Sequence, residues 1–94
     1  MFVYLVLRTE SNSGVTIPFA AFKDCASAVS YANRKLNEIQ STDNWKLTYP
    51  DAKFLEPEGN EEPEATLIGT VTLMKRIDGK TQFIDYRIWK EPVR

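Results

Sequence analysis

The chain has 94 residues, 43% of them hydrophobic and 12% aromatic, which is enough for one small domain and excludes a wholly disordered protein. It has no histidine, which excludes a serine triad, a Cys–His dyad and an ordinary zinc site, and one cysteine, which excludes an intramolecular disulfide. The net charge of −1 argues against a general nucleic-acid binder. With no apolar run near the ~18 residues that cross a bilayer and no leader typical of secretion, the sequence predicts a cytoplasmic protein without a membrane span.

The first predicted strand, residues 2–8, is apolar on both faces. Its alternating positions form two sets, Val3, Leu5 and Leu7 on one face and Phe2, Tyr4 and Val6 on the other. This pattern predicts a central strand covered on both sides of a sheet. A second strand is predicted over residues 15–19, where Pro18 cannot donate a ladder hydrogen bond and therefore indicates an edge strand or a strand end.

A helix is predicted from about Asp24 to Gln40, with Asp24 as its N-cap. Apolar side chains recur at spacings of three and four and form one stripe: Phe22, Cys25, Val29, Ala32, Leu36 and Ile39. Cys25 lies where the helix begins, a position that can lower the pKa of a thiol and make it a nucleophile. Its place on the apolar stripe favours a small buried hydrophobe instead.

A third strand is predicted over residues 45–49, with residues 54–55 as a continuation after a kink. Residues 56–64 then contain five glutamates, two prolines, a glycine and an asparagine, a composition that predicts a mobile acidic loop. Its spacing matches no calcium loop, so a solvated loop is expected. Its functional alternative is an electrostatic contact with a basic partner, for which Glu58, Glu61 and Glu62 are the candidate residues.

Two β-rich runs between residues 67 and 90 are separated only by Asp78-Gly79, which predicts a hairpin with a type I′ turn. The turn sets the register, so that Ile77 faces Lys80 and Leu73 faces Ile84. The core face predicted from this register consists of Leu67, Val71, Leu73, Ile84, Tyr86 and Ile88.

The order strand, strand, helix, strand, strand, strand predicts the α+β class. The economical architecture is two-layered, with one mostly antiparallel five-stranded sheet and a single helix on one of its faces. Residues 1–94 then form a single domain that carries the mobile acidic loop at 56–64.

One helix can cover only one side of such a sheet, and the sequence does not make the other side polar. The predicted register pairs Met74 with Phe83 and Ile68 with Trp89 on that side. A mixture of aromatic residues, methionine and arginine is typical of binding patches. The predicted partner-binding residues of the sheet are Phe2, Tyr4, Ile68, Met74, Phe83, Arg87 and Trp89.

Three alternatives remain open for this second face. Loop residues 50–65 could fold over it and make a second small core, or it could bind a partner protein or a second copy of the chain. A register slip of one residue would exchange the two faces.

No catalytic, cofactor or metal motif stands out, and the glycines at 14, 59, 69 and 79 are too scattered to hold a phosphate. We therefore expect no cofactor and no enzymatic activity. The first functional hypothesis is a protein-binding module that contacts another protein or itself. The second is single-stranded nucleic-acid binding on the same face, which the acidic pI makes unlikely. The third is a structural homodimer.

Three segments carry a resemblance of size and pattern: MFVYLVLR at the start, FKDCASAVSYANRKL in the middle and YRIWKEPV at the end. Over the whole chain the layout resembles small α+β proteins that bacteriophages encode in their accessory regions, including anti-CRISPR and other anti-defence proteins. The resemblance implies a protein that inhibits a host defence complex by occupying a partner's surface in the host cytoplasm. It carries no functional residue over to this chain.

Overall fold

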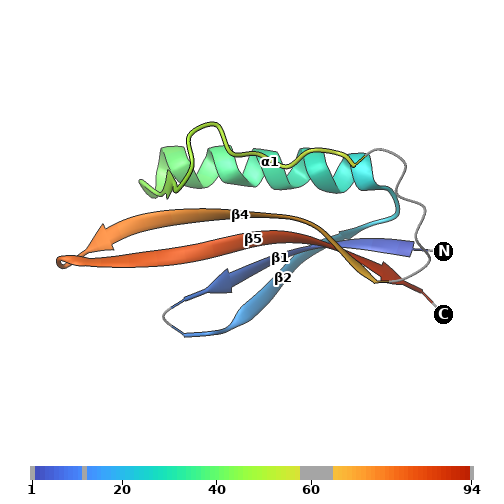
Figure 1. Ribbon diagram of the computed structural model, residues 1–94, viewed down its shortest axis with the longest axis horizontal. Coiled ribbons are helices and arrows are strands. Elements are labelled where there is room, and N and C mark those ends of the chain that lie inside the picture. Colours follow the sequence, from blue (N-terminus) through green and yellow to red (C-terminus); the bar gives the residue numbers. More distant parts are fainter. Residues whose placement is uncertain (1, 12, 58–64, 94) are drawn as a thin grey trace.

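The computed structural model describes residues 2–11, 13–57 and 65–93, which form one helix and a five-stranded antiparallel sheet (Figure 1). The strands follow the order β2-β1-β5-β4-β3 across the sheet. This confirms the predicted α+β class with a single helix. The elements are β1 (Phe2–Glu10), β2 (Thr16–Phe22), α1 (Cys25–Thr42), β3 (Lys46–Leu47), β4 (Thr66–Ile77) and β5 (Lys80–Pro92).

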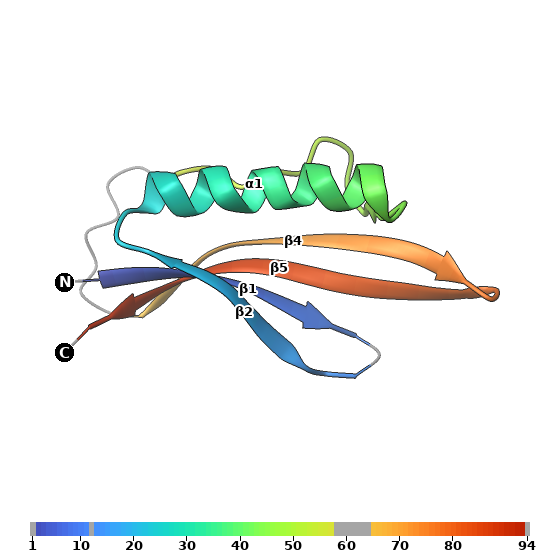
Figure 2. The same cartoon turned by 180° about the vertical axis from the view of Figure 1, so that it is seen from behind.

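Helix and sheet form two layers, with α1 lying along one face of the sheet (Figures 1 and 2). The chain that follows β3 runs back beside α1, on the same side of the sheet as the helix (Figure 1). The β4–β5 turn lies at one end of the long axis, and β1 begins and β5 finishes at the other end.

The β4–β5 hairpin has the predicted turn, since Asp78 and Gly79 both have positive φ angles of 52° and 79°. The register is as predicted from Ile77–Lys80 back to Gly69–Ile88. The predicted pairing is wrong beyond that point, because a β-bulge between Leu67 and Gly69 shifts the register by one residue. Leu67 therefore faces Trp89 and is 47% exposed, whereas Ile68 packs against the core.

The helix begins as predicted. Asp24 is its N-cap, and the Asp24 carboxylate accepts hydrogen bonds from the backbone N–H (2.8 Å) and the hydroxyl (2.9 Å) of Ser27. The buried helix residues are Ala28, Ala32, Leu36 and Ile39, while Cys25 is only partly buried. They pack on the sheet residues Val6, Val71, Leu73, Ile84, Tyr86 and Ile88, together with Trp45 and Phe54.

Two predictions about the strands need correction. Strand β1 has a neighbour on each side, β2 and β5, but α1 covers only one of its faces, so double coverage is not seen in the described residues. The third strand is only two residues long, and residues 54–55 do not continue it. The prediction of an edge position for Pro18 is confirmed, because β2 lies at one edge of the sheet.

Candidate functional site

The candidate site is the face of the sheet that lies opposite α1. Along β5, every second residue (Ile84, Tyr86 and Ile88) is buried on the helix side. Because strand side chains alternate, the residues between them point to the other face. We call this other face the open face, and its members on β5 are Phe83, Asp85, Arg87, Trp89 and Glu91.

The neighbouring strands complete the open face, since residues directly opposite each other in a sheet share a face. On β1, Leu5 lies opposite Trp89 and Leu7 lies opposite Arg87. On β4, Leu67 lies opposite Trp89 and Met74 lies opposite Phe83. Lys46 of β3 lies opposite Met74, at the end of the face nearest the β4–β5 turn.

Four predicted partner-binding residues, Met74, Phe83, Arg87 and Trp89, do lie together on the open face. Ile68 does not, because the bulge places it against the core. Glu58, Glu61 and Glu62 lie outside the described residues.

The placement of Phe2 and Tyr4 on the open face was wrong. Tyr4 lies opposite Lys90, which is 2% exposed and belongs to the helix side, and Tyr4 packs against the core. The Lys90 ammonium lies 4.1 Å from the centre of the Phe2 ring on the same side. The residues of β1 that do reach the open face are Val3, Leu5 and Leu7, which pair with Glu91, Trp89 and Arg87.

Sequence reasoning missed Leu5 and Leu7 because both faces of β1 are apolar, so alternation alone cannot assign them. It missed Leu67 because no sequence signal marked the bulge. The register between β1 and β5 assigns the two faces of β1. It pairs Val6 with the buried Ile88, so Val6 faces the helix and its neighbours Leu5 and Leu7 face the other side.

Along the strands the open face carries an apolar cluster (Leu67 and Trp89), a polar centre (Thr72, Asp85 and Arg87) and a second apolar cluster (Met74 and Phe83). Three of its large apolar side chains are substantially exposed: Leu67 (47%), Phe83 (41%) and Met74 (37%). Between the two apolar clusters, Asp85 accepts hydrogen bonds from the Thr72 hydroxyl (2.6 Å) and from the Arg87 guanidinium (3.4 Å). The indole N–H of Trp89 donates to the Glu91 carboxylate.

Residues 50–57 do not cover the open face. Phe54 is 3% exposed and packs in the core on the helix side. Its backbone N–H and C=O both bond to the side chain of Asn33 on α1, at 2.8 and 3.0 Å. The alternative in which this segment covers the second face therefore fails for the part of the loop that the structure describes.

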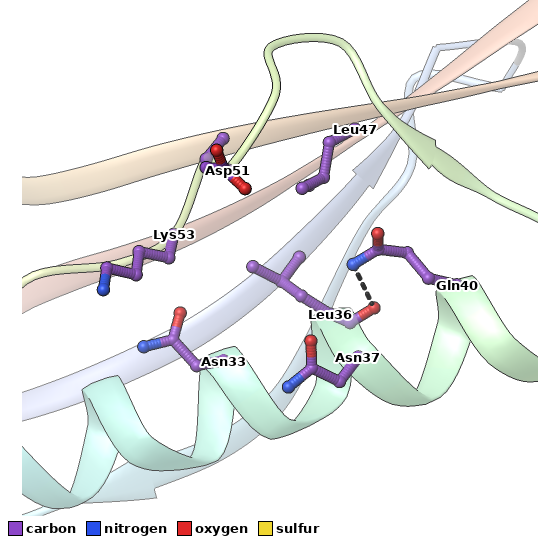
Figure 3. A pocket seen from close by; sticks show the side chains of 8 residues that line it. Asn33, Leu36, Asn37, Gln40, Leu47, Asp51 and Lys53 are labelled. Atoms are coloured by element: carbon purple, nitrogen blue, oxygen red, sulfur yellow. Dashed lines mark hydrogen bonds between the residues drawn. The ribbon is translucent and has the colours of Figure 1, made fainter.

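A depression of about 540 Å³ lies between α1 and residues 51–53 (Figure 3). Leu36 and Leu47 contribute its apolar atoms. The Gln40 amide donates to the Leu36 carbonyl (3.0 Å), and the Asn33 amide is bonded to Phe54. Asn37, Asp51 and Lys53 also line the depression, so its wall carries an amide and charged groups of both signs beside the apolar atoms.

A second depression, of about 600 Å³, lies near the β4–β5 turn and is lined by Lys46, Lys75 and Arg76. Arg76 donates a hydrogen bond to the Gly79 carbonyl (3.2 Å), and the Lys75 ammonium lies 5.6 Å from the centre of the Trp45 ring. The depression is therefore basic, and Met74 of the open face also lines it.

The Cys25 thiol is not activated. Partial burial raises its pKa above the ordinary value of 9.0, and Glu56 and Asp24 raise it further, which outweighs the opposite effect of Lys90. A raised pKa leaves the thiol protonated and weakly nucleophilic at neutral pH. Within the described ranges, no group of three or more cysteine, aspartate or glutamate side chains is placed to hold a metal ion.

Among the described residues, no helix has both the length and the apolar character needed to span a membrane. Comparison of the chain with protein-family models, with curated proteins and with solved structures found no match.

Proposed function

We propose that this protein is a non-catalytic protein-binding module whose contact surface is the open face. The observation that carries the proposal is two apolar pairs, Leu67 with Trp89 and Met74 with Phe83, on either side of Arg87, none of which a described residue covers. Leu67, Met74 and Phe83 are each 37–47% exposed there. Trp, Phe, Met and Arg are also the residue types enriched at protein interfaces.

A binding role agrees with the chemistry of the side chains. The chain has no histidine, so it lacks the side chain that most often serves as a general base. The raised pKa of Cys25 argues against a thiolate nucleophile. Neither observation favours a catalytic centre.

The resemblance to phage anti-defence proteins adds a narrower proposal about the partner. The partner would be a component of a host defence complex in the cytoplasm, and the protein would inhibit it by occluding its surface. Exposed Leu67 and Phe83 would supply apolar contacts, and Arg87 would supply a polar anchor at the centre.

Single-stranded nucleic acid is the second candidate ligand, and the basic depression near the β4–β5 turn favours it. Lys46 and Arg76 lie near Met74, which is opposite Phe83, so phosphates could contact the cations while a base stacks on the ring. A gel shift with a mixed-sequence oligonucleotide tests this candidate. Absence of a shift at low salt would remove it.

The proposed function is tested by capturing proteins from a bacterial lysate with the tagged chain. The parent is expected to retain a stoichiometric protein, and the Phe83→Ala, Trp89→Ala double variant is expected to lose it while remaining folded. Tyr49→Ala is the matched control, because Tyr49 is an aromatic residue that is 76% exposed outside the sheet. Equal capture by the parent and the double variant would refute the open face as the contact surface.

A further inference from the structure

We infer that the occupant of the open face is a second copy of this chain, packed face to face with its β5 antiparallel to the first β5. The inference rests on the proposed function, because it takes the open face as a protein-binding surface, and it names a second copy in place of a host component as the protein bound there. Three features of the described residues support it: the order of side chains along β5, the distribution of charge, and the size of the face.

The open-face residues of β5 are arranged symmetrically about Tyr86. Asp85 and Arg87 lie one position before and after it, and Phe83 and Trp89 lie three positions before and after it. Consider a two-fold axis that lies midway between the two sheets, perpendicular to β5 and level with Tyr86. Rotation about this axis would place Trp89 over Phe83 of the second copy. The same rotation places Arg87 over Asp85 of the second copy.

Strand β4 repeats this complementarity. Leu67 lies at the level of Trp89 and Met74 lies at the level of Phe83. The same axis therefore places Leu67 over Met74 of the second copy. On β4 and β5 each apolar cluster meets an apolar cluster and the polar centre meets a polar centre, as a self-complementary two-fold interface requires, whereas on β1 Leu7 lies over Thr9 of the second copy.

Charge selects the antiparallel orientation. If the two β5 strands ran parallel, Asp85 would face Asp85 and Arg87 would face Arg87, and like charges across an interface are strongly unfavourable. In the antiparallel arrangement, each Asp85 carboxylate gains a second guanidinium beside the Arg87 of its own chain. At the ends, Arg76 on the turn side comes near Glu91 on the terminal side of the second copy.

The open face is large enough for a stable dimer. The five strands contain 43 residues in all, and each residue covers ~3.3 Å along its strand and ~4.8 Å across it, so the face measures roughly 700 Å² in outline. This is on the order of 800 Å², the area that each partner buries in an interface of standard size.

Sedimentation equilibrium of the full chain tests the inference, and the expected mass is that of two chains at about 100 µM. Truncation of an aromatic hot-spot residue costs about 2 kcal/mol or more, so Trp89→Ala should raise the dimer dissociation constant at least about 30-fold. Tyr49→Ala is expected to leave the dimer unchanged. Circular dichroism and a thermal melt establish that each variant is folded.

Charge reversal supplies a test that does not depend on truncating an apolar residue. Asp85→Arg and Arg87→Asp each place like charges across the axis, so each variant alone should sediment as one chain. An equimolar mixture of the two variants restores opposite charges at both positions and should sediment as two chains. Loss of the dimer in each variant followed by recovery in the mixture would support the interface.

A parent chain that sediments with the mass of one chain would overturn the inference, and so would a dimer that survives Trp89→Ala and both charge reversals. The proposed function has a separate readout. If the parent is a monomer but captures another protein through Phe83 and Trp89, the second-copy inference fails and the binding function stands. If capture does not depend on these residues either, both fail.

Discussion

Asn33 on α1 and Phe54 beyond β3 are joined by a reciprocal pair of hydrogen bonds. The Asn33 carbonyl oxygen Oδ1 accepts from the Phe54 N–H at 2.8 Å, and the Asn33 amide Nδ2 donates to the Phe54 carbonyl at 3.0 Å. One side chain thus satisfies both backbone groups of a residue that has no strand partner. The pair holds this segment beside the helix, so residues 50–57 do not cover the opposite face of the sheet.

We expect Asn33→Ala to lower the free energy of unfolding by about 1–3 kcal/mol, because both backbone groups of Phe54 lose their partner in a partly buried position. Urea unfolding followed by circular dichroism measures the change. Asn37→Ala, at an exposed position on the same helix, is the control and should change stability by less than about 0.5 kcal/mol. Equal effects of the two substitutions would contradict the assigned role of Asn33.

Phe54→Ala should destabilise the protein by about 3–5 kcal/mol, because Phe54 is 3% exposed and the substitution leaves a cavity in the core. Its ring lies 3.3 Å from where a Cβ on Gly69 would be, so glycine allows this close contact. The neighbouring Leu55 is 68% exposed, and Leu55→Ala should be nearly neutral. Thermal denaturation of the two variants makes the comparison, and a Leu55→Ala effect as large as that of Phe54→Ala would show that the segment packs differently.

The two faces of β1 can be told apart by neighbouring substitutions. Leu5→Lys introduces a charge beside Trp89 on the open face, so we expect it to abolish partner binding or dimerisation. Tyr4→Ala removes a side chain that packs against the core, so we expect it to lower stability by about 1–3 kcal/mol while the folded molecules still bind. Sedimentation well below the melting temperature separates these effects. Retained binding in Leu5→Lys would reject this assignment of faces.

Stability is expected to fall at alkaline pH. Burial raises the pKa of Cys25 above 9.0 and the pKa values of Tyr4 and Tyr86 above 10.0 in the folded protein. The unfolded chain therefore loses these protons at a lower pH than the folded chain. Their contribution to stability is fully present below pH 9 and is lost as the pH rises through the raised values.

Urea midpoints at pH 8, 9.5 and 10.5 and constant ionic strength should therefore decrease in that order. Cys25→Ser removes the thiol and should reduce the loss between pH 8 and 9.5. If the midpoint were constant up to pH 10.5, the three groups would not be as buried as the structure places them.

Local patterns predicted several elements correctly. The Asp78-Gly79 turn sets the β4–β5 register because both residues adopt positive φ, and the cap at Asp24 sets where the helix begins. Both depend on interactions between residues a few positions apart. The same register correctly placed Met74, Phe83, Arg87 and Trp89 on one face.

The sequence by itself therefore determined the α+β class, the hairpin and the part of the candidate binding face that Met74, Phe83, Arg87 and Trp89 form. Only the tertiary structure decided that Leu5 rather than Tyr4 belongs to that face, because the choice depends on how β1 pairs with β5, more than 80 positions away. Only the tertiary structure revealed the bulge at Ile68 and the docking of Phe54 on Asn33. These features depend on contacts between distant segments, and the alternation of apolar residues along a single strand carries no information about them.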